Sequence, residues 1–457
     1  MSQASSTPPR SASKPRLVLG REIRVLVAAA FFIALGYGLV APVLPQFARS
    51  FNVDVGAAAA VISVFALARL IFAPSAGSLV ERFGERGVYI TGILVVAASS
   101  VACAFAAEYW QLLLFRGLGG LGSTMFTVSA MSLLVRLAPD GGRGRVTSAY
   151  SGAFLLGNIT GPVFGGILGQ FGLHLAFLVY AGTLVIAAGL VAYFLRPSAL
   201  APVLVPVDDA GTTVPGSAEE PLGAAAPLAA GPAAPAAGTP ATSAAPDAPA
   251  MTLREALGLR TYRAALASGF STGWSSFGVR MALVPLFAVV VLDAGPQTAG
   301  ASLAVFAIGT GLALFFAGKL ADSWGRRPMM ILGLTVNGLA MAGLGFSTSV
   351  PVFVILSAVA GFGSGLFSPA QQASVADIIG SRRSGGKVLA TFQMVQDLGT
   401  IIGPIAAGVM VDLWSYGPAF ALAAATSLLA AAYWLRAPET LETATRPAIL
   451  RRKPAGN

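Results

Sequence analysis

The amino-acid sequence predicts an all-α polytopic membrane protein whose twelve transmembrane helices form two pseudo-symmetric six-helix bundles. Three observations support this fold class: the composition is very apolar, the apolar residues fall into long runs, and the two halves of the chain repeat the same short motifs. Of the 457 residues, 55% are hydrophobic and only 11% are charged, unlike the composition of an average soluble protein. Most of the chain is therefore expected to lie in lipid.

Twelve apolar runs are long enough to cross a bilayer as helices, which takes about 20 residues each. The strands of a membrane β-barrel would alternate polar and apolar residues, a pattern that these runs lack. The even number of spans places both termini on one side of the membrane. The predicted spans are 24–47, 56–79, 88–107, 110–136, 146–169, 174–195, 264–291, 297–320, 328–348, 350–375, 388–411 and 416–436.

The basic residues predict the orientation of these spans. If the N-terminus is cytoplasmic, 25 of the 29 Lys and Arg residues lie in the cytoplasmic segments or at the cytoplasmic ends of the spans, as the positive-inside rule requires. The net charge of +10 is then a consequence of topology, and we expect no nucleic-acid partner. The predicted location is the cell (cytoplasmic) membrane, with the chain crossing the lipid bilayer many times and both termini in the cytoplasm.

A change of composition divides the chain into two halves. Residues 201–250 contain ten Pro, seventeen Ala and no basic residue, so we predict a flexible linker that cannot bury enough apolar surface to fold. At its end, residues 252–263 are predicted to form a short amphipathic helix opened by a Thr252/Glu255 capping box. The predicted parts are a basic N-tail (1–23), the N-terminal bundle (24–195), the linker with its short helix (196–263), the C-terminal bundle (264–436) and a C-tail (437–457).

The two halves are related by an internal duplication. The loop GSLVERFGERG (77–87) aligns with GKLADSWGRRP (318–328) at an offset of 241, and GGLGSTMF (119–126) aligns with AGFGSGLF (360–367) at the same offset. Parallel repeats with a binding site at their interface, near the membrane midplane, are typical of secondary transporters. The sequence therefore predicts a transporter of a small-molecule substrate.

Several of these stretches resemble signatures of the major facilitator superfamily. The two repeated loops resemble its loop signature, and LFRGLGGLG (114–122) and GNITGPVFGG (157–166) resemble the fourth- and fifth-span signatures of its drug/proton antiporters. LGYGLVAPVLP (35–45) resembles the first-span signature of the twelve-span drug-export branch. The resemblance covers all twelve spans. It implies the major facilitator fold and proton-coupled export of small amphiphilic or hydrophobic compounds by alternating access.

The resemblance also implies roles for two groups of residues. In the loop signature, glycines allow tight turns, acidic residues can lie against helix N-termini and arginines against helix C-termini. These contacts would close the cytoplasmic gate; a solvated cytoplasmic loop is the alternative. Its residues are Gly77, Glu81, Gly84, Arg86, Gly318, Asp322, Gly325, Arg326 and Arg327. The fifth-span signature allows close helix packing in lipid, with a proline that bends the span; packing alone and a gating role are both open. Its residues are Gly157, Gly161, Pro162, Gly165 and Gly166.

Charged residues inside the spans that break the repeat are functional candidates, because each costs at least roughly 2.5 kcal/mol on insertion scales. Asp397, the only carboxylate that we place well inside a span, is ten residues from Lys387, or roughly 15 Å from the cytoplasmic surface. Arg69 is at a similar depth, and the implied fold makes spans two and eleven neighbours. We expect the two residues to pair in one conformation and to separate in the other when Asp397 is protonated; a static ion pair is the alternative.

Two further arginines complete this set. The resemblance gives Arg116 a role in proton traffic, with helix-to-helix hydrogen bonding as the alternative. Arg280 follows Trp274 and Phe277 at helical spacing, which would place all three on one cavity-facing stripe; lipid-facing or packing aromatics are the alternative. With no acid in the first span, the cavity suits neutral or anionic amphiphiles, or cations that compete for Asp397. The predicted apolar walls are Tyr37, Trp274, Phe277, Tyr150 and Phe392.

Other functions fit the sequence less well. An importer or facilitator of a small metabolite would have the same fold, whereas a receptor or scaffold would need a folded sensory domain outside the membrane. The sequence has no catalytic or phosphate-binding motif, so we predict no enzyme, no cofactor and no metal site. Cys103 is the single cysteine, which excludes an intramolecular disulfide. We expect a monomer that uses protons as the coupling ion.

Overall fold

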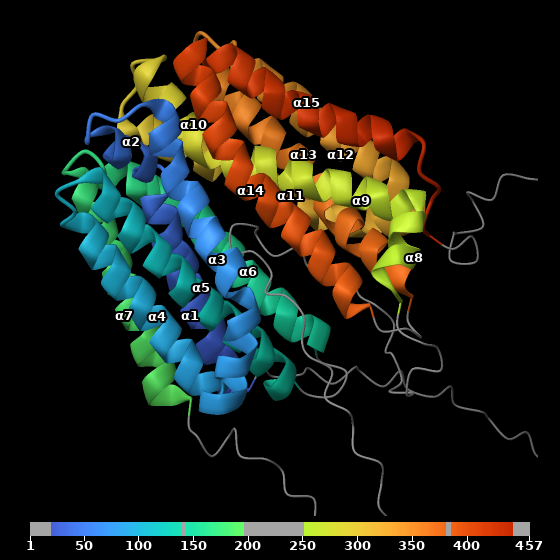
Figure 1. Cartoon of the computed structure of the whole chain (residues 1–457), viewed down its shortest axis with the longest axis horizontal. Coiled ribbons are helices and arrows are strands. Elements are labelled where there is room, and N and C mark those ends of the chain that lie inside the picture. Colours follow the sequence, from blue (N-terminus) through green and yellow to red (C-terminus); the bar gives the residue numbers. More distant parts are fainter. Residues whose placement is uncertain (1–19, 139–142, 196–250, 381–384, 442–457) are drawn as a thin grey trace, which may run out of the picture.

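A computed structural model describes residues 20–138, 143–195, 251–380 and 385–441. Within these ranges, twelve helical segments are long and apolar enough to cross a membrane. They form two bundles, coloured blue to green and yellow to red in Figure 1. The prediction of a twelve-helix, two-bundle protein is thus confirmed. The predicted linker 201–250 and most of both tails lie outside the described residues.

The first bundle follows the predicted spans closely. Its helices are α1 (Arg21–Val40), α2 (Leu44–Arg49), α3 (Val55–Phe83), α4 (Glu85–Ala104), α5 (Tyr109–Leu137), α6 (Arg143–Leu168) and α7 (Leu173–Phe194). The first span was predicted to be continuous over 24–47, but turn residues 41–43 separate α1 from α2. Pro42 and Pro45 explain the interruption, because a proline inside a helix donates no backbone hydrogen bond and clashes with the carbonyl four residues earlier, which kinks or breaks the helix.

The second bundle contains an additional short helix and a divided seventh span. Its elements are α8 (Leu253–Gly258), α9 (Arg260–Ser271), η2 (Thr272–Val279), α10 (Arg280–Val290), α11 (Pro296–Trp324), α12 (Arg326–Leu344), α13 (Val350–Ile379), α14 (Gly386–Leu413) and α15 (Tyr416–Leu435). The Thr252 hydroxyl accepts the predicted hydrogen bond from the Glu255 N–H at 3.3 Å. The amphipathic helix is shorter than predicted, because Leu259 is extended and Arg260 already begins span seven.

Span seven contains a π-helical segment, η2, between α9 and α10. Its glycines lie against α14: a Cβ at Gly273 would meet the Gln396 carbonyl, and one at Gly278 would meet Pro404. The π-helix is rare and frequently marks functional sites. We had assumed regular α-helical spacing here, so this segment was not predicted.

The two bundles repeat one pattern of helix contacts. In the first, α5 packs against α3 and α4, and α6 packs against α1. In the second, α13 packs against α11 and α12, and α14 packs against η2. This is the structural form of the duplication seen in the sequence.

The bundles meet through α3 with α14 and through α6 with α11, so spans two and eleven are neighbours, as predicted. We call the side that carries the α3–α4 and α11–α12 turns the basic side, and the other the opposite side. The bundles are joined towards the opposite side and splay apart towards the basic side (Figure 1). At the joined end, the Asp412 carboxylate accepts hydrogen bonds from the backbone N–H groups of Val55 and Gly56, at 2.9 and 2.7 Å.

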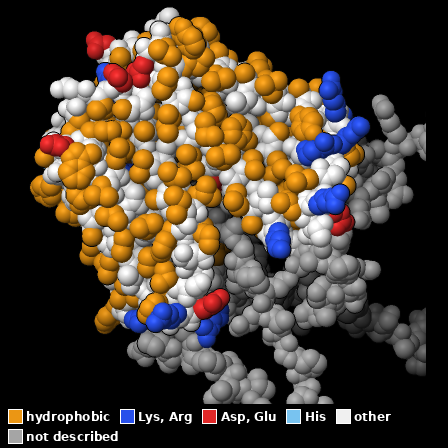
Figure 2. All heavy atoms as spheres, viewed as in Figure 1, with side chains coloured by type: hydrophobic (Ala, Val, Ile, Leu, Met, Phe, Trp, Pro, Cys, Tyr) orange, Lys and Arg blue, Asp and Glu red, His pale blue; other side chains and the backbone are white. Residues whose placement is uncertain are grey.

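The surface has the distribution of a membrane protein. Figure 2 shows hydrophobic side chains covering the flanks of both bundles, with Lys and Arg gathered at the ends that form the basic side. Large apolar side chains such as Phe315 and Leu429 are 83% and 70% exposed, which is favourable in lipid and costly in water. The chain is therefore a multi-pass membrane protein.

Candidate functional site

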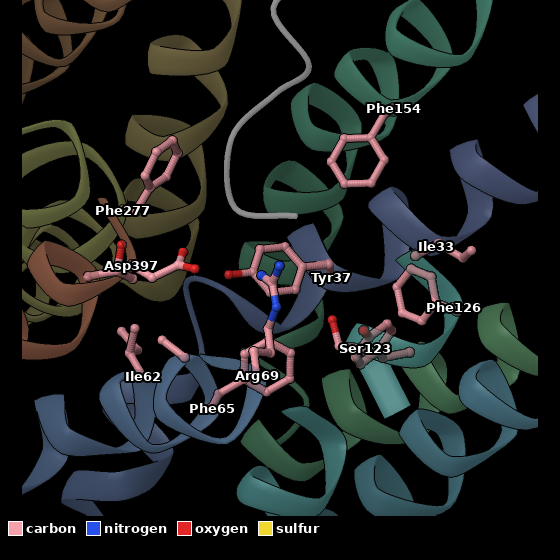
Figure 3. A pocket seen from close by; sticks show the side chains of 13 residues that line it. Ile33, Tyr37, Ile62, Phe65, Arg69, Ser123, Phe126, Phe154, Phe277 and Asp397 are labelled. Atoms are coloured by element: carbon pink, nitrogen blue, oxygen red, sulfur yellow. The ribbon is translucent and has the colours of Figure 1, made fainter. Parts of the chain in front are cut away.

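A pocket lies between the two bundles and is lined by residues of both (Figure 3). Most of its lining is apolar or aromatic, as expected of a small-molecule site. The first bundle contributes most of the wall, and η2 and α14 contribute the rest. The lining residues are Ile33, Tyr37, Ile62, Phe65, Ala66, Arg69, Ser123, Phe126, Phe154, Tyr180, Phe277, Asp397 and Thr400.

Arg69 and Asp397 point into this pocket from different bundles (Figure 3). Arg69 lies on α3 and Asp397 on α14, the two helices that pack against each other across the interface. Both side chains are only partly exposed. The structure thus brings together the two residues that we had placed at similar depth in neighbouring spans. That they pair and separate during transport stays a prediction.

Arg116 lies behind the pocket wall. It is 5% exposed, and its guanidinium carbon is 4.5 Å from the ring centroid of Phe65, which lines the pocket. Its Nε atom has no hydrogen-bond partner among the described residues. The arginine is thus held by a cation–π contact and contributes a positive charge one layer away from the lining.

Arg280 is a second buried arginine with an aromatic partner. It is 7% exposed, its Nε donates a hydrogen bond to the Ser276 carbonyl at 2.9 Å, and its guanidinium carbon is 3.9 Å from the ring centroid of Phe306. Phe277, one turn earlier, lines the pocket, whereas Trp274 and Arg280 itself do not.

The predicted stripe of three residues is therefore only partly formed, because the π-helical turn changes the spacing at which side chains share a face. Of the predicted apolar walls, Tyr37 and Phe277 line the pocket. Tyr150 lies in the hydrophobic core of the first bundle and Phe392 in that of the second, and Trp274 packs against Phe270 with ring centroids 5.7 Å apart.

Sequence reasoning missed several aromatic lining residues on the first bundle. Phe65, Phe126, Phe154 and Tyr180 were not named, because aromatic residues in spans are equally typical of ordinary packing. One signal was available: Phe65 precedes Arg69 by four residues, so both share one face of α3. The other three needed the rotation of their helices, which the sequence does not give.

The two copies of the loop signature form tight turns with arginines at helix ends. Gly84 and Gly325 connect consecutive spans with positive φ angles of 77° and 113°, a conformation that favours glycine. Arg86 donates to the Ala192 carbonyl at 2.7 Å and Arg327 to the Leu435 carbonyl at 2.6 Å. These carbonyls lie in the last turns of α7 and α15, so both arginines lie where a helix C-terminus attracts positive charge.

The acidic residues of the signature are placed differently from our expectation. Asp322 pairs with Arg326, four residues later, and not with a helix N-terminus. The N-terminus of α12 is instead capped by Glu439, which accepts hydrogen bonds from the Arg326 and Arg327 N–H groups at 2.8 and 3.2 Å. Asp322 is still in the last turn of the preceding helix, where i,i+4 pairing is the nearest option. Glu81 is exposed.

The glycines at the first position of each loop copy, Gly77 and Gly318, have open space around them, with no heavy atom within 4 Å of an added Cβ. They therefore do not mark close helix contacts in this conformation.

The fifth-span glycines are contact points of α6. An added Cβ at Gly157, Gly161 or Gly165 would meet the backbone of α1, whereas one at Gly166 would meet Pro296 on α11 of the other bundle. Three of the four thus pack within the first bundle, and the fourth contributes to the interface between bundles. Pro162, inside α6, contacts Gly38 in the same way.

Comparison with known proteins agrees with this architecture. The family model described as Major Facilitator Superfamily matches residues 26–266 and again 264–457, once for each half. Multidrug resistance protein 2 of Bacillus subtilis is 26% identical over 38% of this chain, tetracycline resistance protein class H of Pasteurella multocida 28% over 36%, and quinolone resistance protein NorA of Staphylococcus aureus 27% over 37%. The matched regions span 44%, 41% and 44% of those proteins, less than half of each.

Solved structures show the same fold over more than nine-tenths of the chain. The human organic anion transporter MFSD10 (TETRAN) superposes with a TM-score of 0.60 at 16% identity, covering 91% of this chain and 99% of that one. A bacterial homolog of the human lysosomal transporter Spinster, in an inward-facing and unoccupied conformation, superposes with a TM-score of 0.65 at 16% identity, covering 93% and 99%. With matches to both halves of the sequence and to this twelve-helix architecture, the chain belongs to the major facilitator superfamily, whose members are membrane transporters and not enzymes.

Proposed function

We propose that this transporter exports small amphiphilic or hydrophobic compounds in exchange for protons. The observation that carries the proposal is the placement of Asp397 and Arg69, from different bundles, in one largely apolar pocket at the bundle interface. Asp397 is the only carboxylate in the lining. Its protonation would cancel that charge and weaken its attraction to Arg69, so proton binding can change the relative stability of the two bundle arrangements.

The arrangement of the bundles suggests the order of steps. In the described conformation they are joined towards the opposite side, so a compound would enter the pocket from the basic side. Rocking of one bundle against the other would then open the pocket to the opposite side, where the compound leaves and Asp397 takes up a proton. The return step carries that proton to the basic side. Export requires the basic side to be cytoplasmic and the membrane to be the cell membrane, as the basic residues predict.

The lining suits apolar skeletons. Phe65, Phe126 and Phe154 come from three helices of the first bundle, and Phe277 faces them from the second. Aromatic walls bind varied ring systems by burial and stacking. The curated relatives named above for multidrug, tetracycline and quinolone resistance support export of such compounds. Arg116, behind Phe65, is proposed to assist proton movement by its charge.

Transport by inverted membrane vesicles tests the proposal. Respiration acidifies the vesicle interior, and a panel of neutral, anionic and cationic amphiphiles is added with a fluorescent pH indicator inside. An exporter of this kind should accumulate at least one compound while protons leave, and an ionophore that collapses the pH gradient should stop accumulation. If no compound causes protons to leave the vesicles, or if compounds still equilibrate across the membrane at the same rate after the pH gradient has collapsed, the protein is a facilitator or has another function.

A further inference from the structure

The buried charge around the pocket is strongly unbalanced. Arg69 lines the pocket together with one carboxylate, Asp397, and two further arginines, Arg116 and Arg280, are buried inside the spans behind that lining. Neither Arg116 nor Arg280 forms a salt bridge with an acidic residue in the described part of the chain. Buried charges are normally paired, so a ligand that brings negative charge would improve the balance.

Arg280 is the arginine whose surroundings point most directly to a ligand. Its Nε is satisfied by the Ser276 carbonyl and its face is covered by Phe306. Its terminal Nη groups donate no hydrogen bond to the part of the chain that the structure describes. A guanidinium presents five N–H donors in a fork that matches a carboxylate, sulfonate or phosphate. The stacked, fixed side chain therefore has free donors and little freedom to move.

Other polar atoms at this point also lack partners. The Ser276 hydroxyl and the Trp274 indole N–H are buried without a hydrogen-bond partner among the described residues. Both belong to η2, the segment that ends where Arg280 begins α10. Unsatisfied buried polar groups are uncommon and call for an explanation. Ser276 is also the residue whose carbonyl accepts the Arg280 Nε hydrogen bond, so its hydroxyl is a donor that a ligand held by Arg280 could satisfy.

Arg280 also lies within reach of the pocket. Phe277, three residues earlier, is a lining residue, and the Arg280 side chain is bonded to the carbonyl of Ser276, the residue directly before Phe277. Arg280 is ten residues from Val290 at the opposite-side end of α10, or roughly 15 Å. The lining residue Phe65 is likewise ten residues from Val55, the opposite-side end of α3. Arg280 thus lies at a depth that the pocket lining also reaches.

We propose that Arg280, stacked on Phe306, binds the acidic group of an amphiphilic anion whose apolar part occupies the aromatic pocket. This inference rests on the proposed function for its site and names a substrate class for it: organic compounds with a ring system and one carboxylate, sulfonate or phosphate. Asp397 is a separate lining group on α14 in this arrangement, and remains available to exchange its proton.

Binding of three matched probes tests the inference. Naphthalene-2-carboxylate, naphthalene-2-carboxamide and 2-naphthylmethylammonium share one ring system and differ in charge. Their affinities for the full-length protein in lipid nanodiscs, without any proton gradient, are measured by isothermal titration. The wild type should prefer the carboxylate over the amide by roughly tenfold or more, since charge-assisted hydrogen bonds are the stronger kind. Equal affinities for carboxylate and amide would overturn the inference.

Variants identify the residue. Arg280→Gln should remove the preference for the carboxylate while leaving the amide affinity within about twofold, Arg280→Lys should retain part of it, and Phe306→Leu should reduce it several-fold. Arg49→Gln, an exposed arginine that donates to the Val53 carbonyl at 2.5 Å outside the pocket, is the matched control and should change nothing. A preference that persists in Arg280→Gln would contradict the assignment. If Arg280→Gln does not fold, the lysine and leucine variants decide the question.

Failure of this inference and failure of the proposed function can be told apart. A carboxylate preference that depends on Arg280 without proton release in inverted vesicles would leave the anion subsite standing and reject proton-coupled export. Proton release with neutral or cationic compounds, without a carboxylate preference, would support proton-coupled export and reject the anion subsite.

Discussion

The carboxylate of Asp412, at the end of α14, accepts a hydrogen bond from the backbone N–H of Val55 at 2.9 Å, and so joins the second bundle to the first helical turn of α3. A negative charge at a helix N-terminus is stabilising, by up to about 2 kcal/mol in favourable geometry. The bond is formed on the opposite side, where the bundles meet. It is therefore available only while that side is closed.

Replacing this carboxylate should favour opening of the opposite side. For Asp412→Asn we expect the ratio of the described conformation to the one opened on the opposite side to fall roughly tenfold, since loss of about 1.4 kcal/mol changes an equilibrium by that factor. Electron–electron distance measurements between spin labels at Arg82→Cys and Lys319→Cys, on the basic side in a Cys103→Ser background, would report the two populations. Asp293→Asn, an exposed acid on the same side, is the control; equal distance distributions for Asp412→Asn and wild type would refute this role.

Asp397→Asn should separate transport from proton coupling. The amide has the shape of the acid but cannot release a proton at the basic side, so accumulation driven by a pH gradient should fall at least tenfold. Exchange of labelled for unlabelled compound across the membrane, which needs no net proton movement, should continue. Both assays use the same proteoliposomes, so continued exchange in the second assay shows that the variant is folded. Normal gradient-driven efflux by this variant would show that Asp397 does not carry the proton.

Gly300 should be required for closure of the opposite side. An added Cβ there would meet the Pro162 carbonyl and Gly166 across the α6–α11 contact. Gly300→Ala should therefore keep the bundles apart at that end. Alkylation of a cysteine at the lining position Ala66 by an impermeant maleimide, applied to whole cells, should become several times faster. Gly182→Ala is the control, because no heavy atom lies within 4 Å of an added Cβ there, and it should leave the alkylation rate unchanged. An unchanged alkylation rate in Gly300→Ala would show that the α6–α11 contact is not required for closure.

Two arginine substitutions on the basic side should differ in their effect on stability. The Arg326 side chain is 9% exposed and pairs with Asp322 and Asp377, the latter at 3.3 Å; Arg136 is 37% exposed and pairs with Glu85 at 3.0 Å. Removing one partner of a largely buried pair leaves charges unpaired, whereas exposed pairs contribute about 0–1 kcal/mol. Arg326→Gln should lower the free energy of unfolding by about 2 kcal/mol. Thermal unfolding in detergent should therefore show a larger decrease in the unfolding temperature for Arg326→Gln than for Arg136→Gln. Equal shifts would mean that burial is not decisive here.

Much of the fold could be predicted because lipid imposes few solutions. Apolar runs of fixed length gave the twelve spans, and the repeat at offset 241 gave the two bundles. Asp397 and Arg69 could be placed near each other because depth in a helix follows from counting residues. By contrast, the capping of α12 by Glu439 was not predictable, since this residue lies more than 100 positions away, in what we had assigned to the C-tail.

The candidate site was predicted less completely, for a geometric reason. Depth along a helix follows from the sequence, but the direction in which a side chain points depends on how each helix is rotated against its neighbours. Tyr37 and Phe277 were placed correctly in the lining, whereas Tyr150 and Phe392 proved to be core residues of their bundles. Trp274 was misplaced because a regular helix was assumed where η2 has a wider turn.

The wide turn of η2 has a consequence for the evolution and engineering of span seven. A π-helical turn accommodates one residue more than an α-helical turn, so the segment is equivalent to a regular helix that has gained a single insertion. Deleting one residue there would restore regular winding and rotate all that follows by about 100° relative to α9. Arg280 would leave Phe306, although no side chain around it had been replaced. Which side chain of span seven faces Phe306 therefore depends on the number of residues in η2 as much as on their types.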